Sequence, residues 1–90
     1  MIRAEELLIN MSVYYLLADF LEKTENILLH LLSINPLSEQ GYYRLLDLYI
    51  KTNNVFKYRT CYERYRQMIE KEIGERPLKY YREFYEKSFK

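Results

Sequence analysis

The chain of 90 residues has little of what breaks or crosslinks regular structure: two glycines, two prolines, one cysteine and no tryptophan. A single cysteine excludes an internal disulfide and fits a reducing compartment. The alternating apolar pattern of half-buried strands is also missing, whereas Leu, Glu, Lys, Arg and Ile dominate and favour helix. These features predict one small all-α domain.

A long, uninterrupted apolar segment is likewise missing. The apolar residues at 7–17 are interrupted by Asn10 and Ser12 and preceded by Glu5 and Glu6, and no small-residue cleavage site follows them. This pattern is neither that of a signal peptide nor that of a membrane span. We therefore expect a cytoplasmic protein without membrane contact.

Residue patterns that carry chemistry are scarce. His30 is the only histidine and Cys61 lies far from it, so no metal-ligand spacing exists. Cys61 has no evident base beside it, which predicts a small buried hydrophobe rather than a nucleophile. No Gly-rich phosphate loop, zinc finger or DNA-recognition helix is present. We expect no catalysis, no cofactor, no metal and no small-molecule substrate.

The chain is rich in tyrosine, and its charge is unevenly distributed along the sequence. Many of its 11 tyrosines should lie at the rim of the core or in an interface, where their hydroxyl groups are in water or paired. The net charge of +1 combines −4 over residues 1–40 with +5 over residues 41–90. Tyr58, Tyr62 and Tyr65 fall at helical core spacing, with the neighbouring arginines on the other face. Because the two kinds of side chain do not share a surface, we expect no direct nucleic-acid contact.

The clearest positive feature is a self-repeat with a period of 34 residues, with repeat one at 5–38 and repeat two at 39–72. This is the period of the tetratricopeptide (TPR) unit, a helix-turn-helix hairpin. Tyr15 and Tyr49 occupy its aromatic position, and Pro36 its proline position. We expect an all-α, TPR-like stack of antiparallel hairpins, about five helices, with a C-terminal capping helix at 78–89.

Large residues mark a departure from the repeat. Tyr58 and Tyr65 stand where small residues normally let helices approach closely, so repeat two should pack differently from a regular TPR. Asn53 and Asn54 should form the turn of the second hairpin, because asparagine tolerates left-handed geometry and caps helices. Asn53 lies one period after Asp19, so both turns should fall at the same point of their hairpins.

Capping signals place the helix ends. Asp19 with Glu22 predicts a capping box at the start of the second helix. Asn35 as cap, with Pro36 in the first turn, predicts the start of the third. Gly74 should end the fourth helix. The expected helices cover residues 4–18, 20–33, 36–51, 55–73 and 78–89.

The first helix is apolar on nearly every side. A helix of this kind is normally buried on all faces, and a single hairpin partner covers only one of them. We therefore expect a further helix or a second copy of the chain to pack against it. The groove made by the first helices of the two hairpins is the expected interface, unless a neighbouring helix of the same protein covers it. Its predicted residues are Ile9, Val13, Leu16, Leu17, Tyr43, Arg44, Asp47 and Ile50.

From Leu32 onward, four phrases occur in order, at residues 35–39, 43–49, 62–66 and 72–77. Together they resemble the bacterial transcriptional activator domain, which follows the DNA-binding winged helix in antibiotic-regulatory-protein (SARP) type activators and some response regulators. The likeness spans about two thirds of the chain. The chain departs from the family pattern where Asn35 replaces Asp and Ile73 replaces Leu. Tyr58 stands where the family usually has Ala.

The resemblance implies a C-terminal part of a larger transcription regulator. Its expected partner is a second copy, giving a homo-oligomer such as a dimer, or a neighbouring domain of the same protein. DNA would be contacted only through a winged helix outside these residues. The alternative is a free-standing TPR-type peptide-binding adaptor. A coding sequence with a winged helix upstream of Met1 would favour the regulator.

Overall fold

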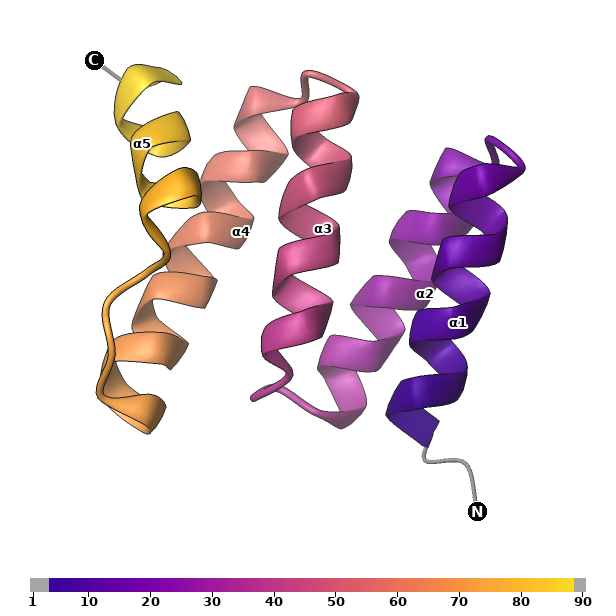
Figure 1. Ribbon diagram of the computed structural model, residues 1–90, viewed down its shortest axis with the longest axis horizontal. Coiled ribbons are helices and arrows are strands. Elements are labelled where there is room, and N and C mark those ends of the chain that lie inside the picture. Colours follow the sequence, from indigo (N-terminus) through magenta and orange to yellow (C-terminus); the bar gives the residue numbers. More distant parts are fainter. Residues whose placement is uncertain (1–3, 89–90) are drawn as a thin grey trace.

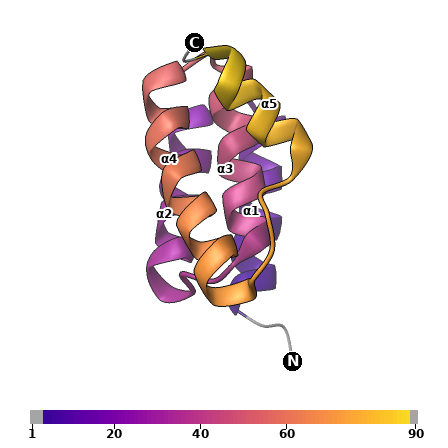
Figure 2. The same cartoon turned by 90° about the vertical axis from the view of Figure 1, so that its left-hand side faces the viewer.

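The computed structural model describes residues 4–88, which form five α-helices and one π-helical segment in two layers (Figures 1 and 2). Helices α1, α3 and α5 lie side by side in one layer, and α2 and α4 form the other. Successive helices pack against each other as antiparallel neighbours, so the all-α prediction is confirmed. The elements are α1 (Ala4–Leu17), α2 (Leu21–Ile34), α3 (Glu39–Lys51), α4 (Val55–Met68), η1 (Ile69–Ile73) and α5 (Lys79–Ser88).

The turn between α1 and α2 corrects the predicted capping box. Asp19 has a left-handed backbone with φ 64°, and Phe20, which makes no side-chain cap bond, precedes α2. The Phe20 amide donates to the Tyr15 carbonyl at 2.8 Å and the Asp19 amide to the Leu16 carbonyl at 3.0 Å. These bonds form a Schellman motif, which satisfies the last carbonyls of α1. Asp19 therefore closes the first helix instead of starting the second.

The turn between α3 and α4 has the same geometry one repeat later. Asn53 is left-handed with φ 53°, and the Asn54 amide donates to the Tyr49 carbonyl at 2.9 Å. In addition, the Asn54 side chain accepts from the Lys57 amide at 3.1 Å and so caps α4. The predicted turn is confirmed, and the two hairpins share one way of reversing the chain.

The start of α3 differs from the prediction. Its cap is Ser38, whose hydroxyl oxygen accepts from the Gly41 amide at 3.1 Å. Asn35 instead accepts from the Leu37 amide at 3.3 Å, a local Asx turn that competes with helix capping. A Cβ atom at Gly41 would lie 3.0 Å from a Leu32 methyl group, so glycine there allows α2 and α3 to approach closely. Pro36 consequently lies in the connection and not in the first helical turn.

At its C-terminal end, α4 continues as the π-helical segment η1. Gly74, with φ 76°, donates its amide to the Ile69 carbonyl and ends the segment as predicted. The buried Pro77 then leads the chain into α5. Phe89, placed in the capping helix by the sequence, lies outside the described residues.

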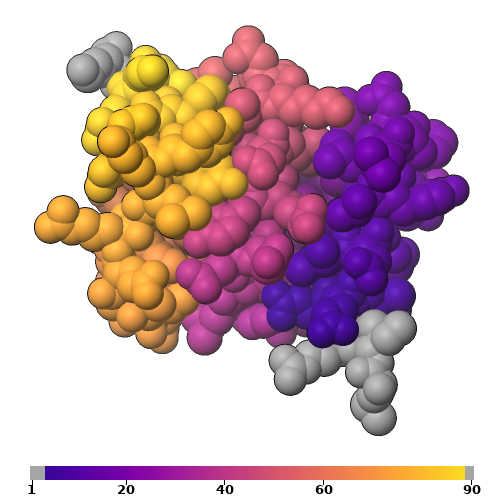
Figure 3. Space-filling model, in the orientation of Figure 1, coloured from indigo at the N-terminus to yellow at the C-terminus, as the bar shows by residue number. Residues whose placement is uncertain are grey.

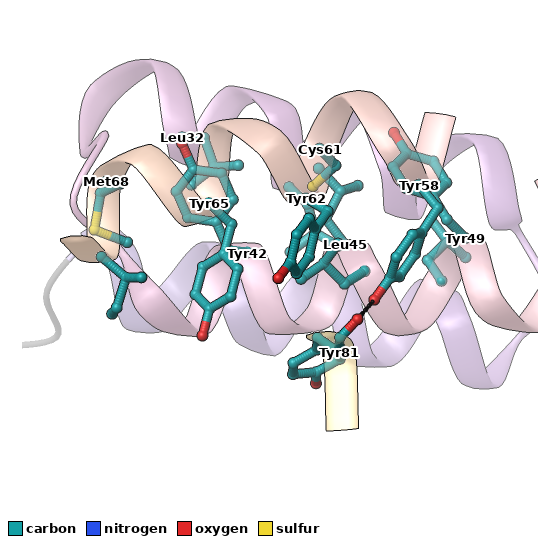
Figure 4. Close-up of a cluster of buried hydrophobic side chains, with 14 residues drawn as sticks. Leu32, Tyr42, Leu45, Tyr49, Tyr58, Cys61, Tyr62, Tyr65, Met68 and Tyr81 are labelled. Carbon is teal, nitrogen blue, oxygen red and sulfur yellow. Dashed lines mark hydrogen bonds between the residues drawn. The ribbon is translucent and has the colours of Figure 1, made fainter. Parts of the chain in front are cut away.

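The core is rich in tyrosine (Figure 4). Tyr58 and Tyr65 are both 0% exposed. The Tyr58 hydroxyl donates to the Tyr81 carbonyl at 2.8 Å, and the Tyr65 hydroxyl accepts from the Leu78 amide at 3.0 Å. Both residues therefore fix α5 to the stack. The two tyrosines that replace small residues of the repeat are what the capping helix docks on, and the expectation of paired hydroxyl groups is confirmed at these positions.

Candidate functional site

The outer side of α1 carries four exposed apolar side chains, here called the α1 stripe. Leu7, Met11, Tyr14 and Leu17 are 52%, 37%, 67% and 82% exposed. Their spacing of four, three and three residues places them on one face of the helix. Residues 7–17 contain no charged side chain. The exposed Asn10, three residues after Leu7 and four before Tyr14, adds one uncharged amide to this face.

The stripe is exposed because α1 is the first helix of the stack and, among the described elements, α2 alone packs extensively against it. Within Ala4–Leu17 only Ser12 is buried, and its hydroxyl donates to the Ile9 carbonyl at 2.7 Å. Half-buried side chains such as Leu16 reach the core from the inner side. A helix with this composition normally lies inside a protein, and here one of its faces has no cover within the described chain.

Polar contacts hold α1 in place at both ends. The Glu5 carboxylate accepts from the Ser38 hydroxyl and, at 3.2 Å, from the Asn35 side-chain amide. At the other end, the Lys23 ammonium lies 5.3 Å from the ring centre of Tyr15 and 5.4 Å from that of Phe20, a cation–π arrangement. The α1 stripe therefore stands on an anchored helix.

Four of the predicted groove residues come together between α1 and α3. Val13 and Leu16 of α1 and Arg44 and Asp47 of α3 line a cavity of about 50 Å³. The Nε atom of Arg44 is buried there and has no hydrogen-bond partner among residues 4–88. A buried guanidinium N–H without a partner is costly, so this small groove has an unused donor for a carbonyl or carboxylate oxygen.

The rest of the predicted groove is covered by α5. Tyr43 stacks on Tyr81 with 5.5 Å between ring centres, and the Tyr81 hydroxyl donates to the Asp47 carboxylate at 2.9 Å. Ile50 is half-buried against the core. For Tyr43, a neighbouring helix of the same chain is thus the cover, whereas Asp47 accepts a hydrogen bond from that helix and stays exposed. In the space-filling view, the surface of α5 lies against α3, with α1 on the opposite side of α3 (Figure 3).

The two remaining predicted residues of α1 point in different directions. Ile9 is half-buried, whereas Leu17 is the most exposed member of the α1 stripe. Repeat register selects the groove side of the helix, so it missed Leu7, Met11 and Tyr14. The signal that could have found them is the apolar character of the helix on all sides, combined with its place at the end of the stack.

The described residues offer little for other chemistry. Burial raises the pKa of Cys61 to about 12, so its thiol stays protonated at neutral pH. His30 is exposed. Across residues 4–88, no three His, Cys, Asp or Glu side chains gather as a metal site would require. Nor does any helix in that range combine the length and apolar character needed to cross a bilayer.

Comparison with known proteins adds no assignment to these surfaces. No protein-family model, no curated protein and no solved structure matches this chain.

Proposed function

We propose that this chain is a protein–protein interaction domain that associates with a second copy of itself through the α1 stripe. The observation that carries the proposal is the exposure of Leu7, Met11, Tyr14 and Leu17 on one uncharged face of an anchored helix. Isologous pairing of two such faces would bury each stripe against its equivalent, as in most symmetric dimers.

The energetic reason is the cost of leaving these side chains in water. Burying an apolar side chain of the size of Leu or Met contributes about 1.5–3 kcal/mol. Four side chains that are each between 37% and 82% exposed therefore provide a substantial driving force for association. Contiguous apolar patches on a soluble domain commonly mark interaction sites.

The resemblance to the bacterial transcriptional activator domain gives this interaction a setting. The phrases at residues 35–39 and 43–49 carry that resemblance. In such a regulator, association through α1 would bring together DNA-reading domains located elsewhere in the protein, and the helical stack would itself contact no DNA. Regulation of transcription is thus the proposed role, with dimerisation as its mechanism.

Light scattering on charge-insertion variants tests the interface. We expect the wild-type mass to rise with concentration to that of a dimer. Leu17→Glu should weaken association at least about tenfold, because a carboxylate would have to be buried in the apolar contact. The matched control is Leu78→Glu, since Leu78 is 48% exposed but lies beside α5. Association that is absent in wild type, or equally weakened by both substitutions, would remove the assignment.

A peptide-binding adaptor is the second candidate, and the buried Nε of Arg44 is the observation that favours it. A bound peptide could accept that hydrogen bond with a carbonyl or carboxylate oxygen while its apolar side chains contact Val13 and Leu16. Arg44→Leu should then abolish peptide binding but leave the mass of the wild-type assembly unchanged. Leu17→Glu should instead weaken self-association and leave peptide binding unchanged. The two variants therefore separate the two functions.

A further inference from the structure

A second surface lies far from α1, on the side that faces the viewer in Figure 2. It is formed by three elements: α4, the connection that joins η1 to α5, and α5 itself. These elements enclose a cleft of about 270 Å³. Three arginines from three separate segments line it: Arg66 from α4, Arg76 from the connection and Arg82 from α5. Arginines that are distant in sequence but share one cleft form a multidentate donor set.

Two acidic residues next to the cleft are paired with groups other than these arginines. Glu63 accepts from the Tyr85 hydroxyl at 3.2 Å and pairs with Arg59 at 3.5 Å. Glu83 lies 3.8 Å from the Lys79 ammonium. Within the described chain, none of Arg66, Arg76 and Arg82 has a carboxylate oxygen within ion-pair distance.

Two carboxylates, Glu70 and Glu86, also line the cleft. Arg66 and Glu70 are four residues apart, a spacing that usually pairs them on a helix. The π-helical pattern that begins at Ile69 breaks this register, because its hydrogen bonds span five residues instead of four. With three guanidinium groups against two carboxylates, the cleft retains a net positive charge.

The floor of the cleft is aromatic. The rings of Tyr62 and Tyr85 are stacked with 4.5 Å between their centres, and Tyr62 is 3% exposed. Burial raises the pKa of Tyr62, so its hydroxyl stays neutral and available as a hydrogen-bond donor. The buried Pro77 fixes the backbone next to Arg76. A preformed cleft costs less conformational entropy to occupy than a flexible one.

We propose that this cleft binds a dianionic phosphate group. Guanidinium groups match phosphate oxygens in geometry and charge and form bidentate hydrogen bonds with them. Three of them around a cleft of this volume can contact one phosphate group from several sides. Free phosphate and a phosphorylated side chain present the same oxygens to these arginines, and the experiment below distinguishes the two sources. The site is independent of the α1 stripe, so each stands or falls by its own experiment.

Phosphorus NMR titration of the full chain tests the site, with inorganic phosphate and a phosphoserine peptide as the two probes. We expect saturable binding that weakens about fivefold in each of Arg66→Gln, Arg76→Gln and Arg82→Gln, because each removes a charge-assisted hydrogen bond in a partly exposed cleft. Arg64→Gln is the matched control, since it removes the same charge from α4 outside the cleft. Tighter binding of the peptide than of inorganic phosphate would identify a protein-borne group, and the reverse a free one.

Two further measurements keep the test independent of folding defects. Glu86→Gln should strengthen binding about twofold, because it removes an anion that competes for the arginines. The phosphoserine peptide should bind more tightly at a pH well above its second pKa of about 6 than below it, whereas sulfate should show no such dependence. Absence of saturable binding, or equal weakening by Arg64→Gln and the three cleft variants, would overturn the proposal.

Discussion

The first helix and the last two differ in a way that hydropathy does not anticipate. Helix α1 is the most apolar helix of the chain, yet none of the apolar side chains in Ala4–Leu17 is buried. Helices α4 and α5 are the most polar, yet they contribute Tyr58, Tyr62, Tyr65 and Tyr81 to the core. Helix α4 is buried on two sides because it lies between α3 and α5. Helix α5 is terminal like α1, but its apolar side chains lie on one face, which packs against the stack, whereas those of α1 lie on all sides.

The two ends of the stack consequently differ in whether their apolar surface is covered. At the C-terminal end, α5 covers the apolar surface of α3 and α4 and turns its polar face to water. At the N-terminal end, the described chain supplies no such cap, and the α1 stripe remains open. A stack of helical hairpins needs both ends covered, which is why the open end is the one that we assign to a partner.

The largest expected effect contrasts one tyrosine from each region. Tyr65→Ala should destabilise the fold by about 3–5 kcal/mol, because it empties a fully buried site and removes the hydrogen bond from the Leu78 amide. Tyr14→Ala, the same change on the α1 stripe, should alter the stability of the monomer by about 0.5 kcal/mol or less. Urea unfolding followed by circular dichroism at low protein concentration measures both. Similar losses for the two variants would contradict the contrast.

A smaller effect concerns the contact between the two hairpins. Glu25 of α2 accepts from the Tyr49 hydroxyl at 2.7 Å and from the Lys57 ammonium at 3.0 Å. Burial alone would raise the pKa of Glu25, but these hydrogen bonds and the charge of Lys57 outweigh it and hold the pKa below its ordinary value. Glu25→Gln should therefore cost about 1–2 kcal/mol at neutral pH.

The pH dependence of that cost follows from the sign of the shift. A lowered pKa in the folded state stabilises the protein above the unfolded pKa, and this contribution is lost as the pH falls through the folded value. The stability gap between wild type and Glu25→Gln should thus stay constant near neutral pH and narrow in acid. Glu22→Gln, an exposed residue on the same helix, is the control. Thermal unfolding over a pH series would contradict the assignment if the gap widened in acid.

The smallest expected effect tests whether the turns of the two hairpins, which share one backbone geometry, are also equal in energy. Asp19 and Asn53 both have positive φ values, which glycine adopts without a steric penalty. Asp19→Gly and Asn53→Gly should each change stability by about 1 kcal/mol or less, and by the same amount within a few tenths. Chemical denaturation measures the two values. A large difference between them would show that the turns are not energetically equivalent.

Periodicity and composition predict much of this fold. The number, order and approximate ends of the helices followed from apolar spacing and from turn residues such as Asn53 and Gly74. The capping assignments of Asp19 and Asn35 were wrong because local signals are ambiguous: the same side chain can close one helix, begin the next or form an Asx turn. Three-dimensional neighbours, such as Glu5 beside Ser38, decide between these uses.

The candidate site was predictable only in part. The apolar character of the first helix drew attention to α1, and the structure places exposed apolar side chains there; that a partner covers them stays a prediction. Which of its side chains face outward depends on how α1 rolls against α2, and repeat register alone does not determine that rotation. The same limit applies to Tyr43 and Asp47, since only the docking of α5 shows that they are held from within the chain.

Hydroxyl-radical footprinting of Met11 decides most directly whether the α1 stripe is an interface. Met11 lies in the middle of the stripe and is 37% exposed, whereas Met68, at 7%, is buried in the core and serves as the internal reference. Oxidation of Met11 should slow as the protein concentration rises, while oxidation of Met68 stays slow throughout. A rate for Met11 that is equally fast at every concentration would show that no second copy covers α1.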